Sequence, residues 1–194
     1  IRMHFRLLPF PGLVEITPRR IVDARGWFAE VFRPDLLAGH IGAARFVQEN
    51  ESFSAAIGTI RGLHFQTPPH AQGKLVRASA GAVHDVVVDL RHGSPSYGRS
   101  LAVTLSAELG NQLWIPAGFA HGFCTLAPDC VVSYKVTARY SPAHDKGLAW
   151  NDPQLGIDWP ALADPQTLSG KDRDLPMLAD LPDYFSMEDS GPCV

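Results

Sequence analysis

The sequence predicts an all-β fold, with a jelly-roll barrel as the best single interpretation and a few short helices at its periphery. Glycine occurs 17 times and proline 16 times among the 194 residues, which is high for a helical protein and suits many turns between short strands. Between these turns, short apolar segments with alternating side-chain character recur at near-regular spacing. Helical patterns are confined to short stretches outside this run of strands. Together these observations favour a β-sandwich or barrel.

The composition is that of an ordinary globular protein. Apolar residues make up 45% and charged residues 19% of the chain, so a single domain over residues 1–194 is the simplest interpretation. A net charge of -3 provides no general attraction to nucleic acid or to an anionic membrane, and neither is expected as a partner. A local arginine pocket for a phosphate remains open.

The sequence shows no pattern typical of secretion or membrane insertion. Charged and imidazole side chains interrupt any apolar run among the first residues, and no segment approaches the ~18 apolar residues of a membrane span. Three cysteines, Cys124, Cys130 and Cys193, lack metal-site spacing and are odd in number, so free thiols are expected. These features predict a cytoplasmic protein.

Residues 1–44 are predicted to form strands and one helical turn ahead of the core. Short strands are expected at residues 13–16 and 21–23, and the second leads into a segment that contains Arg25, Phe28 and Glu30. Residues 34–39 begin with proline and end with glycine, which predicts the helical turn.

The core of the jelly roll is predicted over residues 45–140. Its expected strands are residues 46–50, 60–65, 74–76, 83–90, 101–105, 113–115, 121–126 and 131–140. Gln48 and Asn50 share one face of the first of these strands, because side chains alternate along a strand. By the same alternation, Tyr134 lies on the less polar face of the last strand, which suits the lining of an interior.

The segment 58–74, GTIRGLHFQTPPHAQGK, combines strand-forming apolar residues with several titratable ones. Arg61 and His64 are three residues apart, so a regular strand would point them to opposite faces. Gly62 lies between them and is a position where a bulge would bring both to one side. The Pro68-Pro69 pair ends the strand, since proline has no N–H for the sheet.

Short helices are predicted over residues 141–185, and a loose tail over residues 186–194. Ser141 precedes a proline and is a candidate start for one helical turn. Ser169 is a candidate N-cap for a short helix that runs through Arg173. Residues 174–185 are apolar enough to pack back on the barrel.

Several polar residues of the predicted barrel are unusual enough to carry chemistry. They are His64, Lys74, His84, His121, Tyr134 and Asp172. Imidazole, carboxylate, phenol and ammonium groups in one cavity suit proton abstraction next to a carbonyl, with a base, an acid and a stabiliser of the oxyanion. The competing interpretation places three imidazoles, those of His64, His84 and His121, around a metal ion.

The metal interpretation has a partial motif. Residues 116–121, PAGFAH, resemble the second motif of metal-binding cupins, but the H-x-H of the first motif and its following Glu are missing around His64. A metal-free site is therefore favoured.

Longer motifs connect these residues. RGLHFQTP, QGKLVR, PAGFAHGF and SGKDR occur in this order, within a match that runs from about Val22 to Pro176 and includes DARGWFAEVF and QENESFS. Together they resemble the dTDP-4-dehydrorhamnose 3,5-epimerase family, whose members are cupins that use no metal. The resemblance implies a cupin-like jelly roll without a cofactor. It also implies inversion of C3 and C5 of dTDP-4-dehydro-6-deoxy-D-glucose to give dTDP-4-dehydro-L-rhamnose, a step of dTDP-L-rhamnose biosynthesis.

The resemblance also implies catalytic roles. His64 would remove the protons at C3 and C5, and Asp172 would be its partner. Tyr134 would return a proton from the other face of the sugar. Lys74 would stabilise the enolate oxygen at C4.

Further positions are implied to bind the nucleotide sugar. They are Arg25, Glu30, Gln48, Asn50, Arg61, His121, Asp145 and Lys171, with Tyr140 and Phe28 as candidates to stack on thymine. Members of the family are homodimers that exchange N-terminal strands, so Arg25 and Glu30 are expected to serve the neighbouring subunit. On the residues alone, Lys171 is equally well explained as a solvated helix charge, and Asp145 as an ordinary loop acid.

Two other functions remain open at this point. One is an epimerase of a dTDP-4-keto-6-deoxy sugar that acts at C3 or C5 only, in an antibiotic sugar pathway. The other, of a different class, is a non-catalytic cupin that binds nucleotide sugars.

Overall fold

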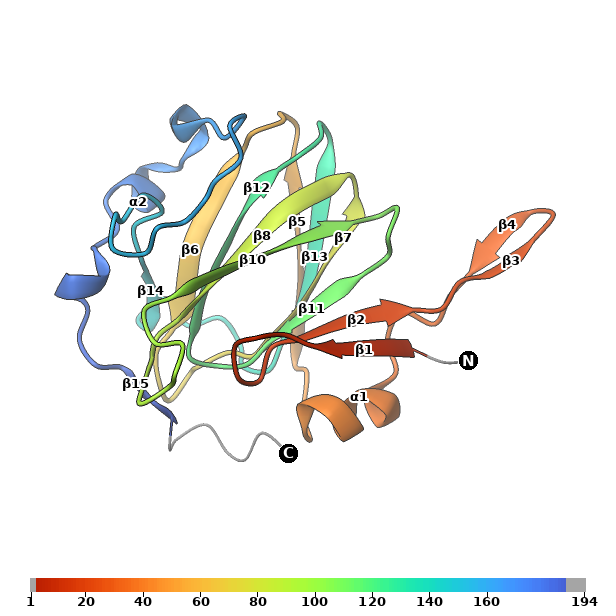
Figure 1. Ribbon diagram of the computed structural model, residues 1–194, viewed down its shortest axis with the longest axis horizontal. Coiled ribbons are helices and arrows are strands. Elements are labelled where there is room, and N and C mark those ends of the chain that lie inside the picture. Colours follow the sequence, from red (N-terminus) through yellow and green to blue (C-terminus); the bar gives the residue numbers. More distant parts are fainter. Residues whose placement is uncertain (1–2, 188–194) are drawn as a thin grey trace.

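The computed structural model describes residues 3–187 and contains two antiparallel sheets that face each other (Figure 1). One sheet has six strands in the order β1 (Met3–Leu7), β2 (Val14–Pro18), β11 (Gln112–Ile115), β7 (Lys74–Ala80), β13 (Cys130–Val136) and β5 (Gln48–Ser54). The other has five, in the order β10 (Ser100–Ser106), β8 (Ala82–Asp89), β12 (Phe119–Thr125), β6 (Ile60–Gln66) and β14 (Asp145–Gly147). This arrangement confirms the predicted all-β, cupin-like jelly roll.

Smaller elements surround the two sheets. A hairpin of β3 (Ile21–Asp23) and β4 (Gly26–Phe28) projects away from the barrel, and helix α1 (Pro34–Ile41) follows it (Figure 1). On the C-terminal side lie helix α2 (Gly170–Arg173), two 3-10 turns at Pro165–Thr167 and Leu178–Asp180, and β15 (Phe185–Ser186), which pairs in parallel with β9 (Arg91–His92). No helix within residues 3–187 is long and apolar enough to cross a membrane.

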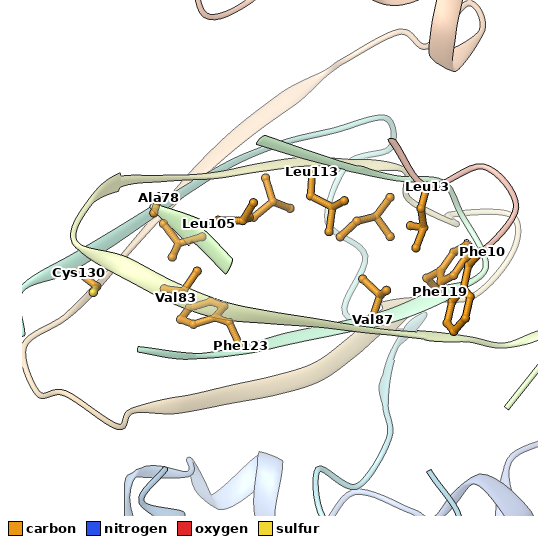
Figure 2. Close-up of a cluster of buried hydrophobic side chains, with 13 residues drawn as sticks. Phe10, Leu13, Ala78, Val83, Val87, Leu105, Leu113, Phe119, Phe123 and Cys130 are labelled. Carbon is orange, nitrogen blue, oxygen red and sulfur yellow. The ribbon is translucent and has the colours of Figure 1, made fainter. Parts of the chain in front are cut away.

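The main core lies between the sheets, and β8 shows how the sequence builds it. Val83 and Val87 point inward and join a cluster that includes Leu113 and Phe123 (Figure 2). The alternate side chains of the same strand, among them Val86, point outward into a second cluster with residues of the C-terminal segment. Both faces of β8 are therefore buried, because the residues after β14 cover the outside of the barrel.

Strand β6 has an irregularity at Gly62. The pairing of β6 with β12 changes register between His121 and Phe123, opposite Gly62. Gly62 has φ +109, and a Cβ there would lie 2.7 Å from Cα of Gly122, so only glycine fits this approach. The irregularity brings Arg61 and His64 into one cavity, as the sequence predicted.

Several predicted boundaries differ from the observed ones. Helix α1 is longer than the single turn predicted, and the strand predicted at 46–50 extends instead over Gln48–Ser54. Strand β13 ends at Val136 rather than at residue 140, because Oγ1 of Thr137 accepts a hydrogen bond from the Gly73 N–H and the chain leaves the sheet. Ser141 starts a turn and not a helix.

The structure confirms two predictions for the C-terminal segment. Ser169 caps α2 as predicted, because its Oγ accepts a hydrogen bond from the backbone N–H of Asp172 at 3.1 Å. Leu178 and Phe185 pack on the barrel, as expected for residues 174–185. Ser186 is paired within β15, so regular structure reaches into the predicted tail, of which residues 188–194 lie outside the described part of the chain.

Candidate functional site

A cavity of about 350 Å³ lies between the two sheets and the C-terminal segment. Its walls combine polar side chains from both sheets with residues from α2 and the loop before it. The lining residues are Ser52, Thr59, Ile60, Arg61, His64, Lys74, His121, Gly122, Phe123, Tyr134, Thr167, Ser169, Lys171 and Asp172. All four predicted catalytic residues are among them.

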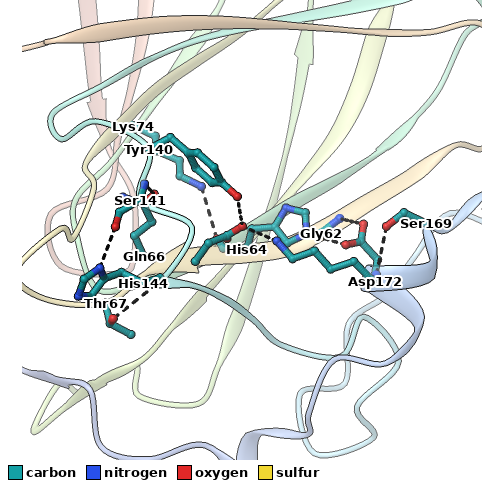
Figure 3. Close-up of polar contacts among 12 residues, drawn as sticks. Gly62, His64, Gln66, Thr67, Lys74, Tyr140, Ser141, His144, Ser169 and Asp172 are labelled. Carbon is teal, nitrogen blue, oxygen red and sulfur yellow. Dashed lines mark hydrogen bonds and ion pairs between the residues drawn. The ribbon is translucent and has the colours of Figure 1, made fainter.

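His64 and Asp172 form the central pair of this cavity. His64 lies on β6, and Asp172 lies on the short helix α2, which packs against β6. Nε2 of His64 is 2.6 Å from Oδ1 of Asp172, and Oδ2 of Asp172 accepts a hydrogen bond from the Gly62 N–H at 3.1 Å (Figure 3). The carboxylate is thereby fixed at both oxygens, and it holds the imidazole ring in one orientation.

The environment keeps Asp172 ionised. Burial alone would raise the pKa of this carboxyl, since the residue is 4% exposed. The hydrogen bonds and charge of His64, with the Gly62 N–H, outweigh burial and hold the pKa below its usual range. The ionised carboxylate thus stays available as a hydrogen-bond acceptor for the imidazole ring.

Lys74 is a buried ammonium on the wall opposite β6. It begins β7 and is 8% exposed, and its Nζ lies 3.4 Å from the carbonyl oxygen of His64. Burial lowers its pKa to about 8, against the opposing attraction of Asp145 and Asp85. At neutral pH most of the population thus carries a poorly solvated positive charge, which suits an oxyanion.

Tyr134 faces the cavity from β13, on the sheet opposite His64. Its half-buried phenol has a raised pKa, because burial outweighs a hydrogen bond with Asn50 and the nearby charge of Arg61, both of which lower it. The hydroxyl therefore keeps its proton at neutral pH and is available as a donor.

A second histidine–aspartate pair lies at the wall of the same cavity, which His121 lines. Nε2 of His121, on β12, is 2.8 Å from Oδ2 of Asp85, on β8. Asp85 is fully buried among apolar residues of the inward face of β8. In the sequence, its place on the same face as Val83 and Val87 is the signal that marks it as an inward-facing charge.

Other predicted binding residues form a connected network. Gln48 donates from Nε2 to Oδ1 of Asn50 at 2.8 Å, and its Oε1 accepts from the backbone N–H of Tyr140 at 3.1 Å. The Tyr140 hydroxyl donates to Asp145 at 3.0 Å, and Lys171 forms an ion pair with the same carboxylate. The pairing of Asp145 with Lys171 shows that neither is an isolated surface charge.

Gln48, Asn50, Tyr140 and Asp145 do not line the cavity themselves but connect to residues that do, whereas three predicted residues lie apart from it. Arg25, Phe28 and Glu30 lie on or just after the projecting hairpin of β3 and β4. Arg25 forms an ion pair with Asp23, at 2.6 Å, and its side chain is 90% exposed. The hairpin therefore places these residues away from the other candidates within one chain.

The three imidazoles of the metal hypothesis do not meet. His84 does not line the cavity, and its ring lies near Trp159 on the outer side of β8. Within residues 3–187, no group of three His, Cys, Asp or Glu residues is arranged to hold a metal ion.

Comparison with known proteins gives this geometry a context. The sequence profile of dTDP-4-dehydrorhamnose 3,5-epimerase matches residues 8–180. A curated protein of that name from Sinorhizobium fredii is 53% identical over 94% of this chain and 93% of its own length. The chain belongs to the dTDP-4-dehydrorhamnose 3,5-epimerase family.

Two further relatives of this epimerase family bear on its chemistry. The crystal structure of the Bacillus anthracis dTDP-4-dehydrorhamnose 3,5-epimerase, with TDP and PPi bound, has a TM-score of 0.87 and 45% identity, over 91% of this chain and 99% of that chain. A dTDP-4-dehydrorhamnose 3-epimerase from Streptomyces niveus is 38% identical over 93% of this chain and 86% of its own length.

One residue that the sequence did not single out supports the site of this epimerase. Gln66 on β6 donates from Nε2 to the carbonyls of His70, at 2.7 Å, and Arg139, at 3.1 Å, and its Oε1 accepts from the Ser141 N–H at 2.8 Å (Figure 3). It thus fixes the loop that carries Tyr140. The available signal was its position two residues after His64, on the same face of the strand.

Proposed function

We propose that this enzyme is an isomerase that inverts C3 and C5 of dTDP-4-dehydro-6-deoxy-D-glucose, giving dTDP-4-dehydro-L-rhamnose. The observation that carries the proposal is a single cavity with an imidazole on one sheet, paired with a carboxylate on α2, and a phenol on the other sheet. A ketone acidifies the C–H bonds on both of its neighbouring carbons. A base and an acid on opposite sides of the ring therefore suffice for inversion.

In this proposal His64 removes the protons, and Asp172 stabilises the imidazolium that forms. The contact of 2.6 Å between them and the lowered pKa of Asp172 support this division. As each proton leaves, negative charge develops on the oxygen at C4. Lys74 binds that oxygen, since its ammonium is buried beside the backbone of His64 and has few competing partners.

Tyr134 is the proposed acid. It delivers a proton to the face of the sugar opposite His64, which converts loss of a proton into inversion. Its raised pKa supports this role, because a phenol that stays protonated at neutral pH is ready to donate.

The nucleotide part of the substrate is assigned to the remaining polar residues around the cavity. Arg61 and Lys171 are cationic and line it, which suits the diphosphate. His121 contributes a further polar wall, with Gln48 and Asn50 beside Tyr134. Tyr140, exposed and held by Asp145, presents a ring on which thymine can stack.

The projecting hairpin is assigned to a neighbouring subunit. We propose a homodimer that exchanges N-terminal strands, with Arg25, Phe28 and Glu30 completing the partner's site. Exposed Val22, Trp27 and Phe28 on the hairpin support this, because such a concentration of apolar side chains is typical of an interface. Light scattering gives the oligomeric state. Mixing inactive His64→Ala protein with Arg25→Ala protein, which is expected to have a raised KM, tests the exchange, since mixed dimers then contain one intact site and turn over substrate at the KM of the wild type.

A cytoplasmic location is part of the same proposal. The two described cysteines, Cys124 and Cys130, are both buried and unpaired, as is usual in a reducing compartment. Fractionation of cells that express the tagged protein tests the assignment.

One experiment tests the reaction itself. The enzyme is incubated with dTDP-4-dehydro-6-deoxy-D-glucose in D₂O, and deuterium at each carbon is measured by NMR. The proposal expects deuterium at both C3 and C5. Label at one centre only identifies a single-site epimerase, an alternative favoured by the similarity to the Streptomyces niveus 3-epimerase. If deuterium enters at neither C3 nor C5, the protein is a binding protein and not an epimerase.

A further inference from the structure

The inward face of β5 is a row of polar side chains. Gln48, Asn50, Ser52 and Ser54 alternate along the strand, and the less exposed positions of β5 are these four. Gln48 and Asn50 bond to each other near one end of the strand. Ser54 is buried at the other end, with 4% exposure.

Ser54 holds the side chain of Arg61. Its Oγ accepts a hydrogen bond from Nε of Arg61 at 3.0 Å, and the carbonyl oxygen of Phe53 accepts one from Nη2 at 2.8 Å. Both acceptors are neutral. Within residues 3–187, no carboxylate lies within 4.0 Å of the guanidinium. Arg61 is therefore a cation that is fixed in direction but not compensated in charge, which suits a bound anion.

The position of Arg61 indicates which part of the substrate it meets. Lys74 and Arg61 lie at opposite ends of β5. Lys74 is level with the start of the strand, because both Lys74 and Gln48 pair with Val136. Arg61 bonds to Ser54 at the other end. In a pyranose ring C1 lies opposite C4. A sugar with its C4 oxygen at Lys74 therefore directs the diphosphate on C1 away from Lys74, toward the end of β5 where Arg61 lies.

We propose that Ser54 is a positioning residue, which holds the Arg61 guanidinium in the orientation that binds the sugar-proximal phosphate of the substrate. This inference rests on the proposed function and adds to it a residue that does not itself touch the substrate. An arginine side chain has many rotamers, and each lost degree of freedom opposes binding. The two contacts with β5 restrict the side chain before the substrate arrives, so less freedom is lost on binding.

The test compares three ligands that differ in their phosphates. Affinities of the full-length protein for dTDP, dTMP and thymidine are measured by calorimetry, and kcat and KM are measured for the nucleotide sugar. Ser54→Ala is expected to weaken dTDP binding about 10-fold, in line with loss of a hydrogen bond to a charged group. It should raise KM by a similar factor, leave kcat nearly unchanged, and hardly affect dTMP or thymidine, which lack the second phosphate.

A double-mutant cycle separates positioning from a structural role. If Ser54 acts through Arg61, then adding Ser54→Ala to Arg61→Gln produces no further loss of dTDP affinity. Ser54→Thr keeps the hydroxyl and should restore binding. Ser79→Ala is the matched control, because Ser79 is exposed on the outer face, bonds to Ser133 and does not line the cavity.

The outcomes are distinguishable from those of the proposed function. If the wild type inverts both centres but Ser54→Ala binds dTDP as tightly as the wild type, the role of Ser54 is wrong. Equal weakening of dTDP and thymidine, or a full effect of Ser54→Ala in the Arg61→Gln protein, also overturns it. Failure of the wild type to exchange protons overturns the proposed function instead. If Ser54→Ala lowers the Tm, Ser54→Cys, which keeps the volume but replaces the strong acceptor, gives the same comparison.

Discussion

The cavity and the projecting hairpin hold the two groups of predicted site residues, and different contacts orient them. In the cavity, His64 and Asp172 meet although 108 residues separate them in sequence. On the hairpin, Arg25 bonds to Asp23, two residues away. The fold of one chain therefore fixes the cavity residues, whereas the hairpin residues depend on the proposed neighbouring subunit for long-range partners. Cavity substitutions should change turnover in every subunit, and hairpin substitutions should change binding through a neighbour.

The largest effect is expected from His64→Ala, which removes the proposed base. The kcat should fall by about 10²–10⁴, the usual contribution of a positioned general base. Affinity for dTDP should change little, because Asp172 and the phosphate-binding cations remain. NMR of proton exchange gives the rate, and calorimetry gives the affinity. His92→Ala is a suitable control, because this histidine pairs with Asp183 and does not line the cavity. Near-normal turnover of His64→Ala would exclude it as the base.

Local sequence patterns predicted some elements of the structure correctly. The alternation over 83–90 correctly predicted β8, because valines on each face of this strand pack into a buried cluster. The cap at Ser169 was equally predictable, since its hydrogen bond spans three residues. Pairing of His64 with Asp172 was suggested by family resemblance and not by spacing, because no local rule connects a strand with a helix more than a hundred residues later.

Errors in the prediction occur where tertiary contacts override local pattern. The alternation continues past Val136, yet β13 ends there. Gly73 bonds to Thr137, and Gln48 bonds to the backbone of Tyr140, so contacts outside the strand set the course of residues 137–140. Gly73 lies just before β7 and Gln48 lies on β5, so the sequence of 131–140 does not contain the information.

Tyr134→Phe should have the next largest effect, and it distinguishes the two faces of the cavity. The change removes only the hydroxyl, so a loss on the order of 10² in the rate of completion at C5 is expected for an acid. Loss of the C3 proton should be affected less, because His64 remains. Deuterium at C3 and C5 is followed in the same D₂O reaction. Equal slowing at both centres would contradict the role of Tyr134 as the acid.

Arg25→Ala should have a smaller effect and of another kind. The expected result is a rise in KM of roughly 10-fold with little change in kcat, because a charged contact to the nucleotide is lost. The Tm should not change, since the side chain is exposed and its ion pair with Asp23 is at the surface. Steady-state kinetics and a thermal melt measure both. A change in kcat with constant KM would place Arg25 with the catalytic residues and remove the distinction between the two regions.

The smallest expected effect concerns Lys74 and pH. Activity should fall as pH rises through about 8, the pKa to which burial lowers this ammonium, because only the charged form stabilises the oxyanion. Stability should respond in the opposite direction. Between pH 8 and the ordinary lysine pKa of 10.5, the unfolded chain binds the proton that the folded chain releases, so stability rises with pH in this window.

Lys74→Met sharpens this last prediction. It removes the buried charge, so the Tm at pH 7 should rise by about a few degrees, while turnover falls because the oxyanion loses its cation. Thermal melts and initial rates between pH 6 and about 10 follow both quantities. A lower Tm for Lys74→Met would contradict the expected cost of burying the ammonium. An activity that stays constant through pH 8 would contradict its role in stabilising the oxyanion. No comparable trade is expected at Arg25, whose charge is already in solvent.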